Sequence, residues 1–317
     1  MSAAPPSSDP GRDALLSWLE RRLKTDLPLT PGVLWHYTEA RGLMGILEHE
    51  ELWATQTNFL NDSTELAHGI GLATKVVAGY NASHVKEVTA RFLGGLVDPK
   101  QAALTGWLDR NLDVYVVCFC SDGDLLSQWR AYAGRDDAGG YAIGMGIRRP
   151  LQGWPQTAPG GHGFALRRVL YDPEEQQAAC RDLVDALVPV LDDDPTDVER
   201  QKFFAKSFVD GVVELASWCK HPAFEEEQEW RIVYVRNNDS AKLPVRHRQS
   251  RGLLVPYVAL ELPSPVEPML GHLPVQALNF GPSPEPALKR RGIESVLAGY
   301  PHLSGVTIEG SSAPLRL

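Results

Sequence analysis

The feature that most constrains the fold is an apolar run at residues 114–121, VYVVCFCS. Most of its side chains are β-branched or aromatic, and both of the faces that a strand would present are apolar. A strand with two apolar faces is covered on both sides, so we expect this run to be a central strand of a sheet. Cys118 and Cys120 alternate along it, as small buried hydrophobic side chains do.

Shorter strands and amphipathic helices are predicted around this run. Strands are expected where β-branched or aromatic residues gather between turn signals, near residues 33–38, 52–55, 141–147, 167–171, 229–235, 252–262, 275–280 and 306–308. Helices are expected where apolar residues recur at helical spacing, from Asp13, after Arg41, from Asp62, and at residues 83–96, 125–132, 174–191, 197–219 and 286–297.

Length and composition favour one large domain. The chain has 317 residues, of which 43% are hydrophobic and 22% charged, the ordinary usage of a globular protein. Residues 1–12 are rich in Pro and Ser, so we expect a flexible tail there and a single domain over residues 13–317. The two helices predicted within residues 174–219 flank an acidic turn, and they either cover the sheet or form an inserted helical hairpin.

Charge, cysteine usage and hydropathy limit the binding partners and the cellular location that we expect for this protein. The formal net charge of −9 argues against nonspecific binding of duplex nucleic acid through a broad basic face. The four cysteines show neither paired metal-binding spacing nor the density of a disulfide scaffold, so no metal is expected. No apolar run approaches the length of a membrane span, and the first twelve residues lack the apolar core of a signal peptide. We therefore expect a cytoplasmic protein that does not bind membranes.

A cluster of carboxylates precedes one predicted strand. Residues 224–229, FEEEQE, place four glutamates in front of the run WRIVYV. Glu227 and Glu229, at i and i+2, would share one face of an extended backbone, where one carboxylate can contact a substrate and the other its reaction partner. A solvated acidic loop is the ordinary alternative for such a charge run.

Three other places hold residues that either bind a ligand or serve the fold. His36 alternates with two aromatic residues in a predicted strand, so either the histidine or its neighbours face the core. Asn61 lies in the loop before a predicted helix, where its amide can satisfy backbone groups or bind a ligand. Trp129 and Tyr132 share one side of a helix, either as core aromatics or, with Arg130, as a slot for a flat ring that carries phosphates.

These segments together resemble a widespread bacterial family of unknown function. The resemblance covers the chain from about residue 33 to the end. It rests on the spaced motifs His36-Tyr37-Thr38, Asn61-Asp62-x-x-Glu65, residues 118–121, Trp129-x-x-Tyr132, residues 224–231, Gly281-Pro282 and Ser312-x-Pro314-x-Arg316. That family is in turn similar to the ADP-ribosyltransferase superfamily, particularly the branch with a His, Tyr, Glu triad that includes the DNA-modifying DarT toxins.

The resemblance implies an α+β fold with mixed, partly split β-sheets and covering helices. In that superfamily a His at the end of the first strand bonds the adenosine ribose of NAD, which corresponds to His36, and an aromatic residue stacks on nicotinamide, which corresponds to Trp129 or Tyr132. The middle Tyr of the triad has no unambiguous counterpart, since Tyr132 lies in a predicted helix and Tyr141 opens a predicted strand. The NAD-binding residues implied are His36, Tyr37, Thr38, Arg41, Asn61, Trp129, Arg130 and Tyr132.

The resemblance also implies a catalytic pair. The last triad member is a Glu at the start of a strand, often within a Glu-x-Glu pair, which corresponds to Glu229, while Glu227 would orient or deprotonate the acceptor. A carboxylate beside the ribose stabilises the positive charge that builds as the bond to nicotinamide breaks. Arg41 or Arg130 would hold the pyrophosphate. Arg231 has no role in the superfamily pattern and is expected to pair with one of the neighbouring acids.

The function implied is NAD-dependent mono-ADP-ribosyl transfer or, as a simpler form of the same chemistry, NAD hydrolysis, in bacterial conflict or phage defence. NAD would be a substrate, no metal would take part, and the acceptor would be a protein, a nucleic acid or a small molecule. The alternative, from a different class, is a non-enzymatic ligand-sensing or interaction module that keeps the fold without the activity.

Overall fold

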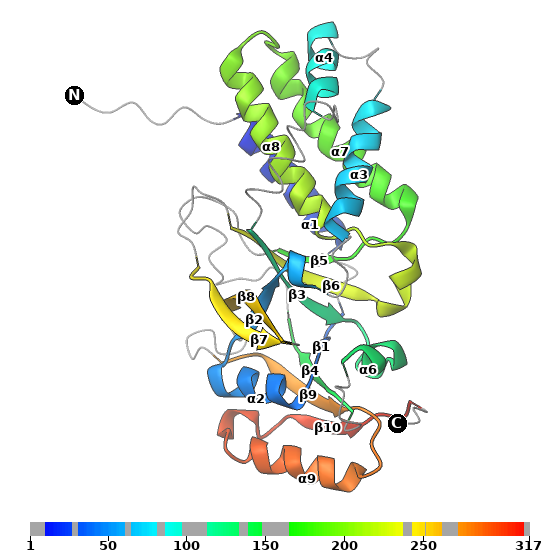
Figure 1. The fold of residues 1–317 in the computed structure, drawn as a ribbon, viewed down its shortest axis with the longest axis vertical. Helices are drawn as coiled ribbons and strands as arrows, with labels where there is room; N and C mark the ends of the chain where they lie inside the picture. Colours follow the sequence, from blue (N-terminus) through cyan, green and yellow to red (C-terminus); the bar gives the residue numbers. More distant parts are fainter. Residues whose placement is uncertain are drawn as a thin grey trace, which may run out of the picture. The chain divides into compact units, whose positions relative to one another are not determined.

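The computed structural model describes residues 10–26, 31–60, 65–80, 86–96, 113–132, 139–147, 165–236, 243–250, 252–261 and 272–313. These residues form two compact units, one made of helices and one built on a β-sheet (Figure 1). We call them the helical unit and the sheet unit.

The helical unit contains α1 (Pro10–Asp26), α3 (Glu65–Ala78), α4 (Glu87–Leu96), α7 (Pro173–Asp192) and α8 (Val198–Ala216). Helices α1 and α3 each pack against α7 and α8, and α4 packs against α3 and α7. The helices predicted within residues 174–219 are confirmed, and their status as an insertion stays a prediction. Helix α1 begins at Pro10, inside the stretch predicted as a tail, and residues 1–9 lie outside the described part of the chain.

Two close contacts hold the helical unit together. Trp18 of α1 stacks on Trp218, with ring centroids 5.5 Å apart and planes at 24°, and both indoles are buried. Gly69 of α3 lies so near α8 that a Cβ atom there would come within 2.4 Å of the Ala216 Cα atom. Since packed interiors leave no spare volume, α3 approaches α8 this closely only because position 69 carries no side chain.

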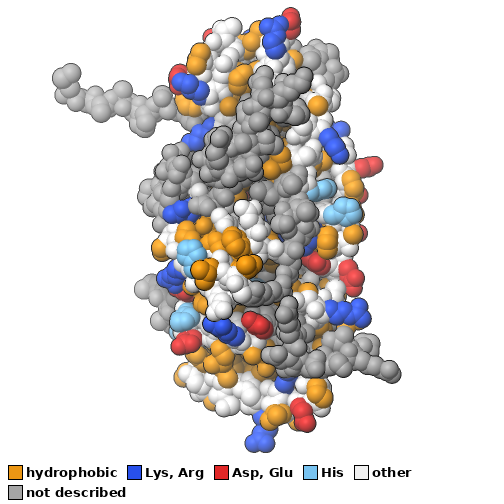
Figure 2. Space-filling view, viewed as in Figure 1, with side chains coloured by type: hydrophobic (Ala, Val, Ile, Leu, Met, Phe, Trp, Pro, Cys, Tyr) orange, Lys and Arg blue, Asp and Glu red, His pale blue; other side chains and the backbone are white. Residues whose placement is uncertain are grey.

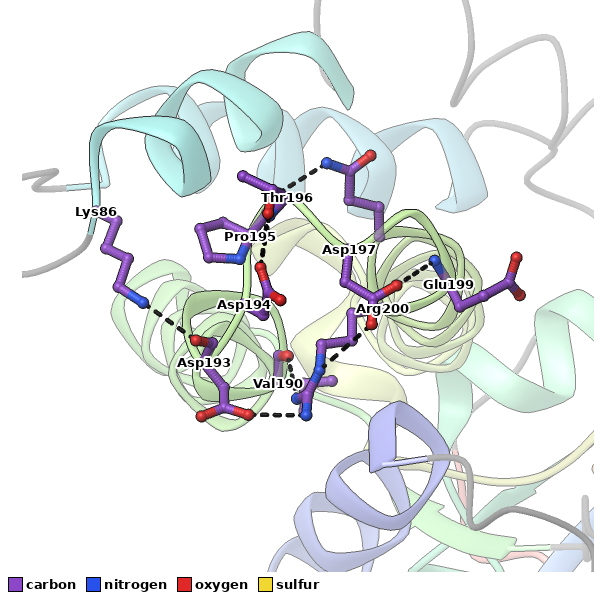
Figure 3. Close-up of polar contacts among 10 residues, drawn as sticks. Lys86, Val190, Asp193, Asp194, Pro195, Thr196, Asp197, Glu199 and Arg200 are labelled. Carbon is purple, nitrogen blue, oxygen red and sulfur yellow. Dashed lines mark hydrogen bonds and ion pairs between the residues drawn. The ribbon is translucent and has the colours of Figure 1, made fainter.

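The acidic turn between α7 and α8 uses its carboxylates locally (Figure 3). Asp193 forms an ion pair with Arg200, at 2.8 Å, and Asp194 accepts hydrogen bonds from the backbone N–H and the hydroxyl of Thr196. Asp197 caps α8 by accepting the backbone N–H two residues later. The turn is therefore a capping structure.

The sheet unit is built on a ten-stranded mixed sheet. Its strands are β1 (Leu34–Thr38), β2 (Leu52–Gln56), β3 (Asp113–Cys120), β4 (Tyr141–Met145), β5 (Ala165–Arg168), β6 (Glu229–Arg236), β7 (Arg246–Ser250), β8 (Leu253–Leu260), β9 (Val275–Phe280) and β10 (Thr307–Gly310). The strand order is β10-β9-β4-β1-β3-β2-β8-β7, and β6 pairs with β3 and β5 outside that path. Strand β7 was not predicted, because its sequence RHRQS has no apolar alternation.

Strand β3 is central, as predicted, and its two neighbours on the main path separate along it. Strand β1 pairs with it through Trp35 and Cys120, whereas β2 pairs with it through Thr55 and Val116 and through the next pair of residues. Strand β1 pairs antiparallel with β3 and β4, β2 with β3 and β8, β4 with β9, β5 with β6, and β7 with β8, whereas β9 and β10 pair in parallel.

Helices cover the sheet on both faces. Helices α2 (Ala40–His49) and α9 (Pro286–Leu297) pack on the face that carries Phe119 and Trp230, which we call the Phe119 face. Helix α6 (Leu126–Tyr132) packs on the opposite face, where Tyr37 and Cys120 are buried, which we call the Cys120 face. The architecture is therefore α+β with a mixed open sheet, as the sequence predicts at this level of detail.

The visible surface is mixed in character. On the face drawn in Figure 2, basic and acidic side chains of the described residues are interspersed. None of the helices in the described ranges combines the length and the apolar character needed to cross a bilayer.

Candidate functional site

His36 occupies the point where β1 and β2 separate along β3. Its Nδ1 atom donates a hydrogen bond of 2.9 Å to the Cys118 carbonyl. The imidazole also meets the Phe119 ring edge to face, with centroids 5.9 Å apart. A backbone group of the central strand therefore fixes the orientation of this ring.

The surroundings of His36 keep its imidazole neutral. Burial lowers the pKa of His36 below its ordinary 6.5, and the positive charge of Arg248 adds to this, while the bond to the Cys118 carbonyl opposes it. A carbonyl can only accept, so Nδ1 carries the proton of the neutral ring. Nε2 then keeps its lone pair and can accept a hydrogen bond from a hydroxyl group.

Arg248 of β7 is a residue that the sequence interpretation missed. Its Nη2 atom donates a 2.9 Å hydrogen bond to the Thr55 hydroxyl, and its Nε atom is buried without a hydrogen-bond partner among the described residues. Burial lowers the pKa of Arg248, yet a guanidinium stays protonated at neutral pH. A half-buried cation with an unused donor favours an anionic group. No motif marks Arg248, because its environment arises only when β7 pairs with β8.

The structure corrects the expectation that Glu227 and Glu229 lie side by side on an extended backbone. Glu227 ends a 3-10 helix, η4 (Pro222–Glu227), and Gln228 adopts the left-handed conformation, with φ of 46°. Ser121 holds Gln228 there, since its N–H donates to the Gln228 carbonyl at 3.2 Å and its hydroxyl to the Gln228 side-chain oxygen at 2.5 Å. The left-handed residue turns the chain between the two glutamates, so they leave it in different directions.

Glu229 is the first residue of β6, as predicted, but it forms a buried ion pair. Its carboxylate accepts two hydrogen bonds from Arg231, from Nε at 2.7 Å and from Nη2 at 2.8 Å. Glu229 is 5% exposed and Arg231 only 2%. The expected pairing of Arg231 with a neighbouring acid is confirmed. Glu227 is half-buried and thus more open to solvent than Glu229.

His36 and Glu229 belong to opposite faces of the sheet. Trp35 lies directly opposite Cys120, so the next residue, His36, belongs to the Phe119 face. The pKa of Cys120 is raised to about 12, first by burial and then by the charges of nearby carboxylates, Glu229 and Glu227 among them, which places both glutamates by the Cys120 face. The two expected catalytic groups therefore do not share one face.

His36 and the segment that carries the two glutamates nevertheless both contact the C-terminal end of β3. His36 bonds the backbone of Cys118, and Gln228, between the two glutamates, bonds the backbone of Ser121. Three residues of strand span about 10 Å. The candidate site is therefore the end of β3, with His36 on the Phe119 face, Glu227 and Glu229 by the Cys120 face, and Arg248 close enough for its charge to act on His36.

Tyr37 and Trp129 are core residues, which corrects their expected role in binding a ligand. Trp129 is fully buried, and its ring meets Tyr37 with centroids 4.7 Å apart. The Tyr37 hydroxyl accepts the Leu125 N–H and donates to the Asp122 carbonyl, both at 3.0 Å. Because neither ring has a free face, nicotinamide cannot stack on them in this structure.

The other expected residues are dispersed. Thr38 ends β1, and its hydroxyl lies where a Cβ atom on Gly42 would be, so it packs against the start of α2. Arg41 and Arg130 are exposed, on α2 and α6, and each is open to a ligand. Tyr132 is half-buried at the end of α6 and remains the accessible aromatic candidate. Asn61 lies outside the described residues.

The helix and strand placement of the two triad-tyrosine candidates is confirmed. Tyr132 ends α6 and Tyr141 begins β4, as the sequence predicts. Tyr141 packs against Lys289, whose Nζ atom lies 4.8 Å from the ring centroid. Neither tyrosine is thereby assigned to a triad.

Comparison with known proteins places part of the chain in context. Residues 128–232 match the family described as "Protein of unknown function (DUF2971)", so this part of the chain is similar to that family, in agreement with the expected resemblance to a family of unknown function. The matched segment runs from α6 into β6 and includes both Glu227 and Glu229. Neither a curated protein nor a solved structure matches the chain.

Proposed function

We propose that the chain binds NAD at the end of β3 and cleaves the bond between nicotinamide and ribose, as a mono-ADP-ribosyltransferase or an NAD glycohydrolase. The observation that carries the proposal is His36, a neutral imidazole whose Nδ1 atom is engaged by the Cys118 carbonyl. Its Nε2 atom is an acceptor prepared for a ribose hydroxyl. Superfamily resemblance implies the same role for this histidine.

Arg248 is the residue of the proposed site that would bind the phosphate groups of NAD. Its buried Nε atom lacks a partner within the described ranges, and its charge reaches His36. A pyrophosphate would accept from a guanidinium in this position. We therefore assign the pyrophosphate contact to the half-buried Arg248 in place of Arg41 or Arg130, which lie exposed at the surface.

Glu227 is the carboxylate that the proposal places beside the reacting ribose. As the bond between C1′ and the nicotinamide nitrogen breaks, its electron pair leaves with nicotinamide and positive charge builds on the ribose. A carboxylate stabilises that charge more than it stabilises bound NAD. The acceptor, or water, then bonds C1′ and releases its proton, which Glu227 can take. Glu229 is less suited, because Arg231 already offsets its charge.

A ligand-sensing module without turnover is the second candidate, and one observation favours it. Glu229, which corresponds to the catalytic glutamate of the superfamily, is buried and accepts two hydrogen bonds from Arg231. A site that had lost its catalytic carboxylate would still hold a dinucleotide through His36 and Arg248. Binding of NAD without release of nicotinamide would distinguish this case from catalysis.

The test is nicotinamide release from NAD, with and without cell lysate as a source of acceptor. Glu227→Gln should reduce release by about 100-fold or more, the range for removal of a general base. Glu226→Gln, an exposed neighbour on the same 3-10 helix, is the control and should behave as wild type. Release that needs lysate would indicate transfer to a target.

Binding is measured separately through the rise in melting temperature that NAD produces. Arg248→Met should weaken NAD binding about tenfold or more, whereas Arg246→Met, on the same strand but paired with Glu51 at the surface, should not. No nicotinamide release together with no NAD-dependent rise in melting temperature would refute the proposal. Binding without release would support the sensing module.

A further inference from the structure

Three side chains that commonly bind metals meet in the sheet unit, and none belongs to the proposed NAD site. Glu50 follows the last residue of α2, His272 lies just before β9, and His302 is in a 3-10 helix, η5 (Pro301–Leu303). Glu50 Oε1 lies 2.9 Å from His302 Nε2 and 3.5 Å from His272 Nδ1. One ligand atom from each residue lies within 4.8 Å of the other two.

The backbone orients Glu50 toward the two imidazoles. Its Oε2 atom accepts a hydrogen bond of 2.8 Å from the Leu273 N–H, which leaves Oε1 facing the histidines. Glu50 also adopts the left-handed conformation, with φ of 53°, at a helix end where glycine is the usual residue. A side chain in that conformation costs about 1 kcal/mol. The strained residue, Glu50, is thus the one whose carboxylate faces the two imidazoles.

His272 supplies an independent observation. Its Nδ1 atom is buried and has no hydrogen-bond partner in the described parts of the chain, although it points toward Glu50. The two imidazoles are stacked, with centroids 3.8 Å apart and planes at 10°. A buried ring nitrogen without a partner is costly unless something binds it. A metal ion would satisfy that nitrogen and the carboxylate together.

We propose that Glu50, His272 and His302 bind a divalent transition-metal ion, Zn²⁺ first among them. Two imidazoles and one carboxylate form a ligand set that such ions prefer. With bonds of 2.0 to 2.1 Å, tetrahedral ligand atoms lie about 3.3 Å apart, close to the two separations around Oε1. Because the rings are parallel, one of them rotates as the ion binds. Three protein ligands leave a fourth position for water at this half-exposed site.

The metal would join three segments that are far apart in sequence. It would connect the end of α2 to the segments that begin β9 and that precede β10. The expectation that no metal is bound rested on the spacing of the cysteines and on the lack of His or Asp partners near them, and it did not consider Glu50, His272 and His302. The site is also independent of the NAD proposal, since neither its ligands nor its test involve His36 or Glu227.

The test uses untagged, chelator-treated protein titrated with Zn²⁺ by calorimetry and with Co²⁺ by visible absorption. The expected result is one ion per chain, with the ligand-field bands of a four- or five-coordinate Co²⁺ site. His302→Ala and Glu50→Gln should each weaken Zn²⁺ binding about tenfold or more, because each removes one of three ligands. Wild-type protein should also melt at a higher temperature when Zn²⁺ is added.

His247→Ala is the matched control, since His247 is an exposed histidine of β7 in the same unit and outside the cluster. It should bind Zn²⁺ like the wild type. The His302 side chain is 24% exposed, and circular dichroism verifies that His302→Ala keeps the fold. The proposal is overturned if the wild type binds Zn²⁺ only at millimolar concentration, or if His302→Ala and Glu50→Gln bind it as tightly as His247→Ala does.

Discussion

Arg231 covers both carboxylate oxygens of Glu229, two residues earlier on the same face of β6. Residues i and i+2 of a strand point the same way, so the fork of the guanidinium can meet the carboxylate in parallel. The guanidinium offsets the charge of the Glu229 carboxylate inside the sheet unit. In this structure, then, the motif Glu-Trp-Arg describes a buried ion pair with a core tryptophan between its members.

We expect Glu229→Gln to destabilise the folded protein, so a loss of activity in this variant would not by itself show a catalytic role. The amide removes the negative charge that Glu229 places against the buried guanidinium of Arg231, and breaking a buried ion pair in this way costs about 3 to 5 kcal/mol in the free energy of unfolding. Urea denaturation measures this. The control, Glu226→Gln at the surface, should change the free energy of unfolding by about 0.5 kcal/mol or less. Equal stability of the two variants would contradict the structural role of the pair.

His36 should titrate below its ordinary range. Its folded-state pKa is lower than the unfolded value of 6.5, so the folded protein binds fewer protons between the two values. The contribution of His36 to the free energy of unfolding is therefore complete above pH 6.5 and declines as the pH falls below it. Nitrogen NMR at pH 7 should show a proton on Nδ1 and none on Nε2. A ring that titrates at 6.5 or carries its proton on Nε2 would disprove the assignment.

Asp124 should stabilise the protein only while it is ionised. Burial alone would raise the pKa of its carboxyl, but hydrogen bonds from Ser311, Trp129 and Ser312 outweigh burial and lower it. A lowered folded-state pKa means that this stabilisation is complete above about pH 4 and is lost as the pH falls through the folded-state pKa. The decline between pH 5 and pH 2 should be shallower in Asp124→Asn. An identical pH profile in the variant would show that these bonds add nothing.

Two glycines of α3 should respond in opposite ways to the same substitution. Gly69→Ala would push a Cβ atom against the Ala216 backbone and should cost about 1 to 3 kcal/mol. Gly71 has open space where its Cβ would lie, so Gly71→Ala should stabilise the helix by about 0.5 to 1 kcal/mol. Thermal unfolding of both variants against the wild type tests this. The same sign of change in both would contradict the packing of α3 on α8.

Local patterns in the sequence determined much of the secondary structure. The apolar run of β3, the helical spacing in α7 and α8 and the glycine and proline signals before α9 act over a few residues, so they can be read without the fold. The placement of Glu229 at the start of a strand belongs to the same class. Strand β7 was not predicted, because its polar sequence forms a strand only when β8 lies beside it.

Tertiary structure alone decided how the candidate residues are used. Whether Trp129 stacks on a ligand or fills the core depends on Tyr37, far away in sequence, and the face to which His36 belongs depends on the register of β1 against β3. The left-handed turn at Gln228 depends on Ser121. Glu50, His272 and His302 carry no motif at all, because most of the sequence separates Glu50 from the two histidines that it meets in the fold. The sequence states which chemical group each residue carries, but the burial, the partners and the charge environment of that group come from contacts between distant segments.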